Sequence, residues 1–373
     1  MRKMIKEFVV PARIIFGRGA VEQLLPECSC FGKNGLIVHG ASVERNGFLK
    51  RILKHKKNLT KIHLWQHRGT EPTLKQLDEL RAFAAKKNIE WIAGVGGGSV
   101  MDIAKACAGL FHAPLKSISY HNGAKILPSK MPFIAVPTTA GTGSEATFVC
   151  VFTNEKTNVK KSFRHISFMA KLVILDPSLI EQCPREVIAY AGMDALTQGI
   201  ESYFSKKSVF FTDVFAYESV RLVFNNLLPA YKGAGGEVYD KLLIGSYFAG
   251  IALCNARLGL VHGLAHPLGA LFDQPHGLTC AICLPFVLEY NRPFVVEKYK
   301  KLSFLVGGDL VKSIRNIMDE MKILSPFQQE DLNEKVLARI INETLASGST
   351  ATNPVTVEKK EVKKIIYRIF GRE

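Results

Sequence analysis

The sequence predicts an α/β layered domain followed by an all-helical domain, and three observations support this. Short apolar runs alternate with helical stretches up to about residue 180, only helical stretches follow Asp176-Pro177, and neither a repeat nor a low-complexity linker interrupts the chain. Such alternation is typical of a parallel sheet covered by helices. A chain of 373 residues is long enough for two domains. We place them at 1–180 and 181–373, with the expected ligand site in a cleft between them.

Four apolar runs in the first domain predict buried parallel strands. They are Leu36–His39, Trp91–Val95, Phe133–Val136 and Leu172–Leu175. Between the first two, Glu71–Ala85 carries apolar residues at helical period, which predicts a crossover helix with Pro72 in its first turn.

The second domain shows long apolar patterns of helical period, separated by proline and glycine positions such as Pro184, Gly233, Gly259 and Pro275. The predicted helices cover Arg185–Phe204, Val209–Tyr231, Val238–Ala256, His262–Phe272, Leu278–Tyr290, Lys312–Met321, Gln329–Leu345 and Val355–Phe370. This domain is therefore expected to contain no sheet.

Composition places the chain among ordinary folded proteins, with 47% hydrophobic and 22% charged residues. No apolar run approaches the roughly 20 residues of a membrane helix, and the first residues lack the apolar region of a signal peptide. We therefore expect a cytoplasmic protein. The net charge of +16 could indicate nucleic acid, a membrane surface or an acidic substrate. Because the lysines are spread out, we expect solvated helix faces and neither nucleic-acid nor membrane binding.

Three histidines in an H-x3-H-x9-H pattern indicate a divalent metal site. They are His262, His266 and His276, and Asp194 with Gln198 forms a second pair at helical i,i+4 spacing. Such spacing points both members of a pair to one face of a helix, and helical bundles build internal metal sites from faces of this kind. Cys280 and Cys283 lie in an apolar run, so we expect them to pack as small hydrophobic residues and leave them outside the site.

A glycine-rich turn in Ile92–Lys105 runs from a strand into a helix and predicts a pyrophosphate site. Gly96, Gly97 and Gly98 would let the backbone approach the phosphates, and Ser99 can cap the helix. The alternative is a tight strand-to-helix connection without a ligand.

A second loop, Val136–Thr147, also leaves a strand and is expected to enter a helix. It carries the hydroxyls of Thr138, Thr139, Thr142 and Ser144. Two such loops on neighbouring strands could hold a dinucleotide from both sides, although capping and turn chemistry would also explain the hydroxyls.

With these motifs in this order, the chain resembles the iron-containing (group III) alcohol dehydrogenase family. The motifs are Gly96–Asp102, Pro137–Glu145, Ala191–Gln198, His262–His276 and the Asn353-Pro354 segment. The resemblance covers nearly the whole chain. It implies an N-terminal Rossmann-like domain, an all-α C-terminal domain in a dehydroquinate synthase-like architecture, and a homodimer as the default state of the family. It further implies hydride transfer between NAD(P) and a small alcohol or aldehyde, with Fe²⁺ or Zn²⁺ as the metal.

Carried over residue by residue, the family's metal ligands fall on Asp194, His262 and His276, and its fourth ligand, ordinarily histidine, falls on Gln198. An amide oxygen is a weaker ligand than imidazole for iron or zinc. We therefore expect looser metal binding, or three protein ligands with a water. His266 resembles the family's catalytic proton relay; the alternative is a histidine that orients a metal ligand.

The cofactor preference is predicted from the residues that follow Leu36–His39. Dinucleotide folds commonly hold the adenosine ribose with a carboxylate after a strand, but Gly40 stands there, with Ser42 and Arg45 nearby. The absence of a carboxylate predicts NADP(H) over NAD(H), with Ser42 or Arg45 near the 2′-phosphate. The remaining candidate cofactor residues are Asp102, Lys160 (or its neighbour Lys161) and Leu179.

Three other functions stay open from the sequence. A metal-free reductase resembling maleylacetate reductase would share the architecture, but the retained Asp194, His262 and His276 count against it. A lyase resembling dehydroquinate synthase would restore its cofactor within each turnover. A nucleic-acid binder would use the +16 charge and a degenerate cofactor site.

Overall fold

The computed structural model describes residues 7–56, 61–69, 71–157 and 159–372. It contains two compact units, Val10–Cys183 and Pro184–Glu373, the second of which includes the N-terminal stretch up to Val9. The first unit holds a parallel sheet with helices and the second is built from helices, so the predicted fold class is confirmed.

The first unit is organised by a six-stranded, fully parallel sheet in the order β1-β8-β5-β4-β2-β3. Its strands are β1 (Ile14–Phe16), β2 (Asn34–His39), β3 (Lys61–Gln66), β4 (Trp91–Gly96), β5 (Phe133–Pro137) and β8 (Leu172–Leu175). His39 pairs with Val95, and Gly96 pairs with Pro137, so the carboxyl ends of β2, β4 and β5 are neighbours. All four predicted strands are present, whereas β1 and β3 were not predicted.

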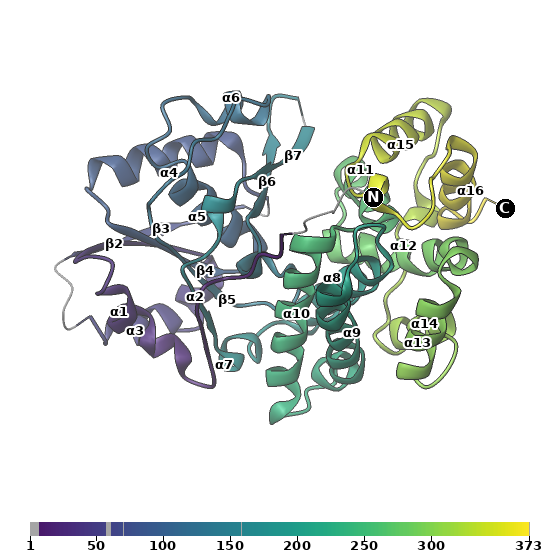
Figure 1. The fold of residues 1–373 in the computed structure, drawn as a ribbon, viewed down its shortest axis with the longest axis horizontal. Coiled ribbons are helices and arrows are strands. Elements are labelled where there is room, and N and C mark those ends of the chain that lie inside the picture. Colours follow the sequence, from purple (N-terminus) through teal and green to yellow (C-terminus); the bar gives the residue numbers. More distant parts are fainter. Residues whose placement is uncertain (1–6, 57–60, 70, 158, 373) are drawn as a thin grey trace, which may run out of the picture. The chain divides into compact units, whose positions relative to one another are not determined.

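Helices cover both faces of this sheet, as Figure 1 shows for α1 and α3 on one side and α4 and α5 on the other. They are α1 (Leu24–Cys28), α2 (Ala41–Arg45), α3 (Phe48–Leu53), α4 (Leu74–Lys86), α5 (Gly98–Gly109), α6 (Ser117–His121) and α7 (Pro177–Ile180), with 3-10 turns η1 (Ala20–Gln23), η2 (Ser144–Ala146) and η3 (Ile166–Phe168). Ile37, Trp91 and Ile134 face the α1 and α3 side of the core. On the other face Gly94 lets α5 pack closely, since a Cβ there would lie 3.0 Å from the Ala104 Cβ.

Two predictions of how a loop enters a helix in this unit were wrong. Pro72 precedes α4 instead of lying in its first turn, because Thr73 caps the helix by accepting the Gln76 N–H at 3.2 Å. The second loop enters the three-residue 3-10 turn η2 and then the hairpin of β6 (Val149–Asn154) and β7 (Val159–Arg164), not a helix. Lys105 on α5 holds that turn by donating to the Ser144 and Val149 carbonyl oxygens.

The second unit is all-helical within the described residues. Its helices are α8 (Arg185–Phe204), α9 (Phe210–Tyr231), α10 (Glu237–Ala256), α11 (Leu260–Phe272), α12 (His276–Asn291), α13 (Val296–Leu305), α14 (Leu310–Glu320), α15 (Glu334–Ala346) and α16 (Lys359–Ile369), with 3-10 turns η4 (Arg292–Phe294), η5 (Phe327–Gln329) and η6 (Thr350–Thr352). Helix α13 was not predicted. Helix α15 begins five residues later than Gln329, because Asn333 caps it by accepting the Val336 N–H at 3.0 Å.

Glycines let α8 pack against its neighbours at close range. A Cβ at Gly192 would lie 2.2 Å from Leu227 on α9, and one at Gly199 would lie 3.1 Å from the Ser219 hydroxyl. The remaining face of α8 carries the buried polar residues Asp194, Gln198 and Glu201. Along the described chain no single helix is long and apolar enough to cross a membrane; α10 and α11 meet that requirement only together, across a bend of 104°.

Candidate functional site

Helix α8 presents three buried polar side chains on one face. Asp194, Gln198 and Glu201 follow at i, i+4 and i+7, and each is at most 5% exposed. This spacing keeps them on one side of the helix. A cluster of this kind inside an apolar bundle is costly unless each group has a partner.

Helices α11 and α12 bring histidines to this face. His262 lies near the start of α11, and its Nε2 is 3.3 Å from Asp194 Oδ1. His276 is the first residue of α12, and its Nε2 is 3.8 Å from the same oxygen. The structure therefore brings together the three residues that the sequence predicts as metal ligands.

A fourth donor, Cys280, joins this cluster. Its apolar surroundings in the sequence predicted a packing residue outside the site, so that prediction was wrong. Its Sγ lies 3.6 Å from His276 Nε2 and 3.9 Å from His262 Nε2. The ligand atoms of Asp194, His262, His276 and Cys280 all lie within 4.8 Å of one another. The available signal was the i,i+4 spacing of His276 and Cys280 on one helix, which the apolar surroundings of the cysteine obscured.

Glu201 holds His262 from behind and was also missed. Its Oε2 lies 2.6 Å from His262 Nδ1, and its Oε1 accepts the Val261 N–H at 2.6 Å. A carboxylate on the far nitrogen of a histidine fixes the ring tautomer and leaves the other nitrogen available for a metal. Glu201 is therefore a positioning residue for His262.

The Asn353-Pro354 segment of the predicted motif fixes the start of α11. Asn353 Oδ1 accepts the Leu260 N–H at 3.2 Å and the Asn291 side-chain N–H at 2.9 Å. These bonds satisfy one of the amide groups that a helix start leaves unpaired. Asn353 thereby locates the turn that carries His262.

The charges of the cluster suit a dication. Burial alone would raise the pKa of Asp194, but the hydrogen bond with His262 and the charge of His276 outweigh it and lower that pKa. Burial would lower the pKa of His262, yet Cys280, Asp194 and Glu201 together hold it well above its ordinary value. The donor set is acidic overall and attracts positive charge. Gln198 Oε1 is buried without a hydrogen-bond partner, which is unusual for a buried polar atom and leaves it free to bind a ligand.

His266 lies one turn after His262 and stacks on His276, with ring centroids 5.4 Å apart and planes inclined by 21°. It is half-buried, and it is not one of the four residues whose ligand atoms cluster within 4.8 Å. Its position beside two candidate ligands fits both a proton relay and a ring that orients His276.

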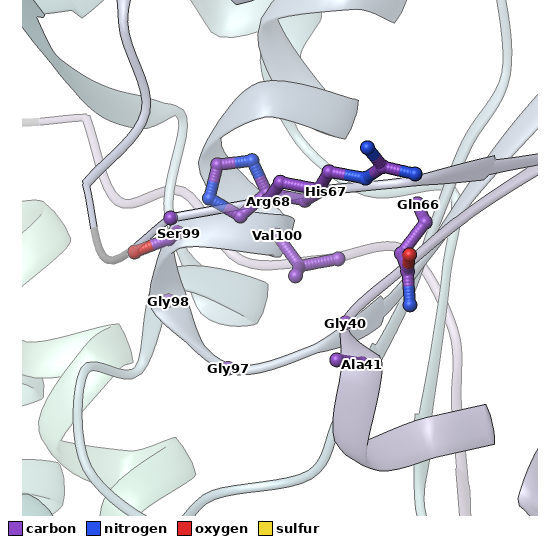
Figure 2. Close-up of a pocket in the computed structure, with 10 residues that line it drawn as sticks. Gly40, Ala41, Gln66, His67, Arg68, Gly97, Gly98, Ser99 and Val100 are labelled. Carbon is purple, nitrogen blue, oxygen red and sulfur yellow. The ribbon is translucent and has the colours of Figure 1, made fainter. Parts of the chain in front are cut away.

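In the α/β unit, a cavity of about 440 Å³ lies beside the carboxyl ends of β2 and β3 and the start of α5 (Figure 2). Four predicted cofactor residues line it, namely Gly40, Gly97, Gly98 and Ser99. The wall is completed by Ala41, Val100, the last residue of β3, Gln66, and the three residues that follow it, His67, Arg68 and Gly69. The segment Gln66–Gly69 was missed because β3 itself was not predicted.

The polar groups of this cavity fit a dinucleotide. Helix α5 begins at Gly98, so its first N–H groups face the cavity and can bind phosphate. Both ring nitrogens of the buried His67 lack a hydrogen-bond partner, and Arg68 adds an exposed positive charge. Ser99 lies inside the first turn of α5 and does not cap it, because Gly97 occupies the cap position; that prediction was wrong.

Comparison with known proteins gives a consistent result. The family model for iron-containing alcohol dehydrogenase matches residues 11–177, and the model for the C-terminal part of the Fe-containing alcohol dehydrogenase family matches residues 188–370. The chain belongs to the iron-containing alcohol dehydrogenase family. The family resemblance drawn from the motifs is thereby confirmed.

Individual relatives span the whole chain. An NADPH-dependent butanol dehydrogenase from Clostridium saccharobutylicum is 30% identical, with 97% of each chain covered. A 1,3-propanediol dehydrogenase from Citrobacter freundii is 30% identical, with 98% of each covered. The structure of an iron-containing alcohol dehydrogenase from Thermococcus thioreducens matches with a TM-score of 0.91 at 27% identity, covering 98% of this chain and 100% of the other. The predicted enzyme class, an NAD(P)-linked alcohol dehydrogenase, is confirmed.

Among the other residues of this alcohol dehydrogenase that the sequence assigns to the cofactor, several are engaged by the protein itself. Asp102 Oδ1 accepts the Ser144 hydroxyl at 2.6 Å, and Asp102 Oδ2 accepts the Val151 N–H at 2.7 Å. Lys160 pairs with Glu71 at 2.8 Å, and Leu179 is buried in the core of the α/β unit. These contacts give each of the three a structural role, and their contact with cofactor stays a prediction.

The threonines of the second loop lie against the glycine turn. A Cβ at Gly98 would be 2.7 Å from the Thr142 methyl group, and one at Gly97 would be 3.5 Å from Thr139. Thr138 is buried and donates its backbone N–H to the Gly96 carbonyl at 2.9 Å. The two predicted loops therefore adjoin. Ser42 and Arg45 do not line the cavity.

Glu145, the last residue of the loop motif, provides a test of pH dependence. Burial raises its pKa from 4.5 to about 7, although a backbone hydrogen bond and the charge of Lys105 oppose the rise. Because this pKa is raised in the folded protein, the folded state is favoured by the protonated carboxyl. This contribution to the free energy of unfolding is fully present below about pH 4.5 and is lost as the pH rises to about 7. The difference between these values corresponds to at most about 3 kcal/mol. Glu145→Gln is expected to gain much less stability over the wild type at pH 5 than at pH 8.

Thermal unfolding at both pH values measures this effect, with the exposed Glu155→Gln as the matched control. An equal gain in stability for Glu145→Gln at pH 5 and pH 8 would show that ionisation is not its cause.

Proposed function

We propose that this chain is a metal-dependent alcohol dehydrogenase or aldehyde reductase that prefers NADP(H). The observation that carries the proposal is the convergence of Asp194, His262 and His276 from three helices on one buried point. In this proposal Val10–Cys183 is the dinucleotide-binding domain and the helical unit is the metal and substrate domain, close to the division at residue 180.

The protein's own residues have distinct parts in this proposal. When bound, the metal supplies Lewis acidity toward the substrate oxygen, and the nicotinamide carries the hydride. Asp194, His262 and His276 would hold the cation, and the predicted fourth position, Gln198, offers an amide oxygen. Glu201 keeps the His262 ring in the tautomer whose Nε2 is free to ligate. His266 is proposed to pass a proton between the substrate oxygen and solvent.

The substrate in this proposal is a small alcohol or aldehyde, and the protein acts as a cytoplasmic homodimer that binds neither nucleic acid nor membranes. The names of relatives, butanol and 1,3-propanediol dehydrogenases, support small alcohols as substrates.

The proposed function is tested with a panel of aldehydes, assayed after chelation and after addition of Fe²⁺, Zn²⁺ or Mn²⁺. Stoichiometric loss of NADPH that depends on metal is expected. Full turnover without metal would favour the metal-free reductase, and turnover without net loss of cofactor would favour the lyase.

The NADP(H) preference is proposed from the groups around the cavity. No carboxylate stands at Gly40 to repel a 2′-phosphate, and Arg68 places a positive charge on the cavity wall. The relative that is 30% identical over 97% of both chains is described as NADPH-dependent. A charge-assisted hydrogen bond contributes about 1.5–3 kcal/mol.

We therefore expect kcat/KM to be at least tenfold higher with NADPH than with NADH, and Arg68→Ala to remove most of that ratio. Steady-state kinetics with both cofactors measures it. Arg45→Ala, on the same unit but outside the cavity, is the matched control. A ratio that falls in Arg45→Ala and not in Arg68→Ala would assign the 2′-phosphate to Arg45, as the sequence first suggested. A higher kcat/KM with NADH would refute the preference.

A further inference from the structure

We propose that the thiolate of Cys280 is the fourth protein ligand of the metal, at a site where the family resemblance places a histidine and this chain has Gln198. The proposal rests on the metal-dependent function proposed above, because it concerns the same cluster. It adds a ligand that the family pattern does not assign, and it changes which metal the site should prefer.

The position of Cys280 follows from the fold. His276 and Cys280 stand at i and i+4 on α12, so both side chains lie on the same face of that helix. That face meets α8 and α11, where Asp194 and His262 lie. The thiol is completely buried, and its contacts include the ligand nitrogens of both histidines. It therefore lies within the cluster and not merely beside it.

The distances are within about 0.5 Å of those in a tetrahedral metal site, including the longest nitrogen–oxygen distance, 3.8 Å from His276 Nε2 to Asp194 Oδ1. Zinc–sulfur and zinc–nitrogen bonds of about 2.3 and 2.0–2.1 Å, at the tetrahedral angle, put the two ligand atoms about 3.6 Å apart. Cys280 Sγ lies 3.6 Å from His276 Nε2 and 3.9 Å from His262 Nε2. By the same geometry a nitrogen and an oxygen ligand lie about 3.3–3.4 Å apart, and His262 Nε2 is 3.3 Å from Asp194 Oδ1. One ion can therefore contact these atoms after small adjustments.

Gln198 is the weaker candidate for the fourth position. Its buried Oε1 has no hydrogen-bond partner and could serve as a ligand, whereas the Cys280 sulfur already lies 3.6 Å from His276 Nε2 and 3.9 Å from His262 Nε2. A thiolate is also a stronger ligand for zinc than an amide oxygen.

A thiolate changes the chemistry of the site. With Asp194 and Cys280 both anionic and two neutral imidazoles, the donor set carries two negative charges, which balance a dication. Soft thiolate ligands favour zinc, and a donor set of sulfur and nitrogen with tetrahedral geometry is typical of it. The proposal therefore includes a preference for Zn²⁺ over Fe²⁺ in this member of the family.

Cobalt substitution of the full-length protein tests the ligand directly. Co²⁺ bound by a thiolate absorbs strongly in the near ultraviolet through sulfur-to-metal charge transfer, and this band is independent of catalytic activity. The wild type loaded with one Co²⁺ is expected to show the band, and Cys280→Ala and Cys280→Ser are expected to lack it. Cys283→Ala, a buried thiol outside the cluster on the same helix, is the matched control and should keep the band.

Zinc affinity, measured by chelator competition, gives a second readout. Loss of a group that only supports a ligand costs about 10–100-fold in affinity, so loss of Cys280 itself should cost at least about a hundredfold, with Cys283→Ala unchanged. Wild-type protein that binds metal and reduces aldehydes without a thiolate band would overturn the assignment of Cys280 and leave the proposed function standing. Wild-type protein that binds no metal but turns over would overturn both.

Discussion

Replacing His262 with alanine is expected to remove the metal and to lower kcat/KM for aldehyde reduction by at least about a thousandfold. The imidazole is 2% exposed, and its ligand atom lies within 4.8 Å of three other ligand atoms, so its loss removes one of the four donors that would surround the ion. Lewis-acid stabilisation of the developing oxyanion contributes several kcal/mol, and about 4 kcal/mol corresponds to a thousandfold in rate.

The change has a second consequence through Glu201. Its Oε2 loses the 2.6 Å contact with His262 Nδ1, which leaves a buried carboxylate oxygen without its partner. We therefore expect the variant to be less stable as well as inactive, so the metal loss must be measured at a temperature where circular dichroism shows a folded protein.

Metal content per chain and steady-state kinetics check the prediction. His112→Ala, at an exposed position, is the matched histidine-to-alanine control and should retain both metal and activity. A folded His262→Ala protein that keeps its metal and more than a tenth of its activity would contradict the ligand assignment.

Long apolar patterns gave the most accurate predictions. Helix α8 has the predicted bounds, Arg185–Phe204, because an apolar helix starting after Pro184 has well-marked ends. Helix α13 (Val296–Leu305) was missed because only Tyr299 and Leu302 are buried, too few to produce a periodic signal. The hairpin strand β7 was missed for the same reason, since four of its six residues are charged or polar and only Phe163 is buried.

The site shows a similar division between pattern and packing. Asp194, His262 and His276 were predictable because their spacing departs from ordinary core composition. Cys280 was not, since a cysteine in an apolar run is usually a packing residue, and only the approach of α12 to α11 brings its sulfur to His262. Glu201 lies 61 residues from His262, so their pairing is a tertiary contact that local spacing could not reveal.

Gly277 is the residue that allows α12 to approach α8, and Gly277→Ala is expected to destabilise the protein by about 3 kcal/mol and to lower kcat/KM by about a hundredfold. A Cβ at this position would lie 2.2 Å from the Tyr190 carbonyl oxygen and 2.6 Å from its carbon. These are backbone atoms of α8, so no side chain can rotate away, and overpacking of this kind costs about 1–3 kcal/mol or more. Alanine favours helix over glycine by only about 1 kcal/mol, which does not offset the collision.

The loss of activity follows from the neighbours of the collision. His276 precedes Gly277, and Asp194 lies one turn beyond Tyr190, so separating the helices moves two candidate ligands apart. A displacement of about 1 Å in a catalytic site can cost about a hundredfold in rate. Denaturant unfolding, metal content and kinetics measure the three effects. Gly348→Ala is the matched control in the same unit, since a Cβ there meets no atom within 4 Å. A Gly277→Ala protein with wild-type stability and metal content would show that α8 and α12 can separate without disturbing the ligands, and that the metal site does not depend on their close contact.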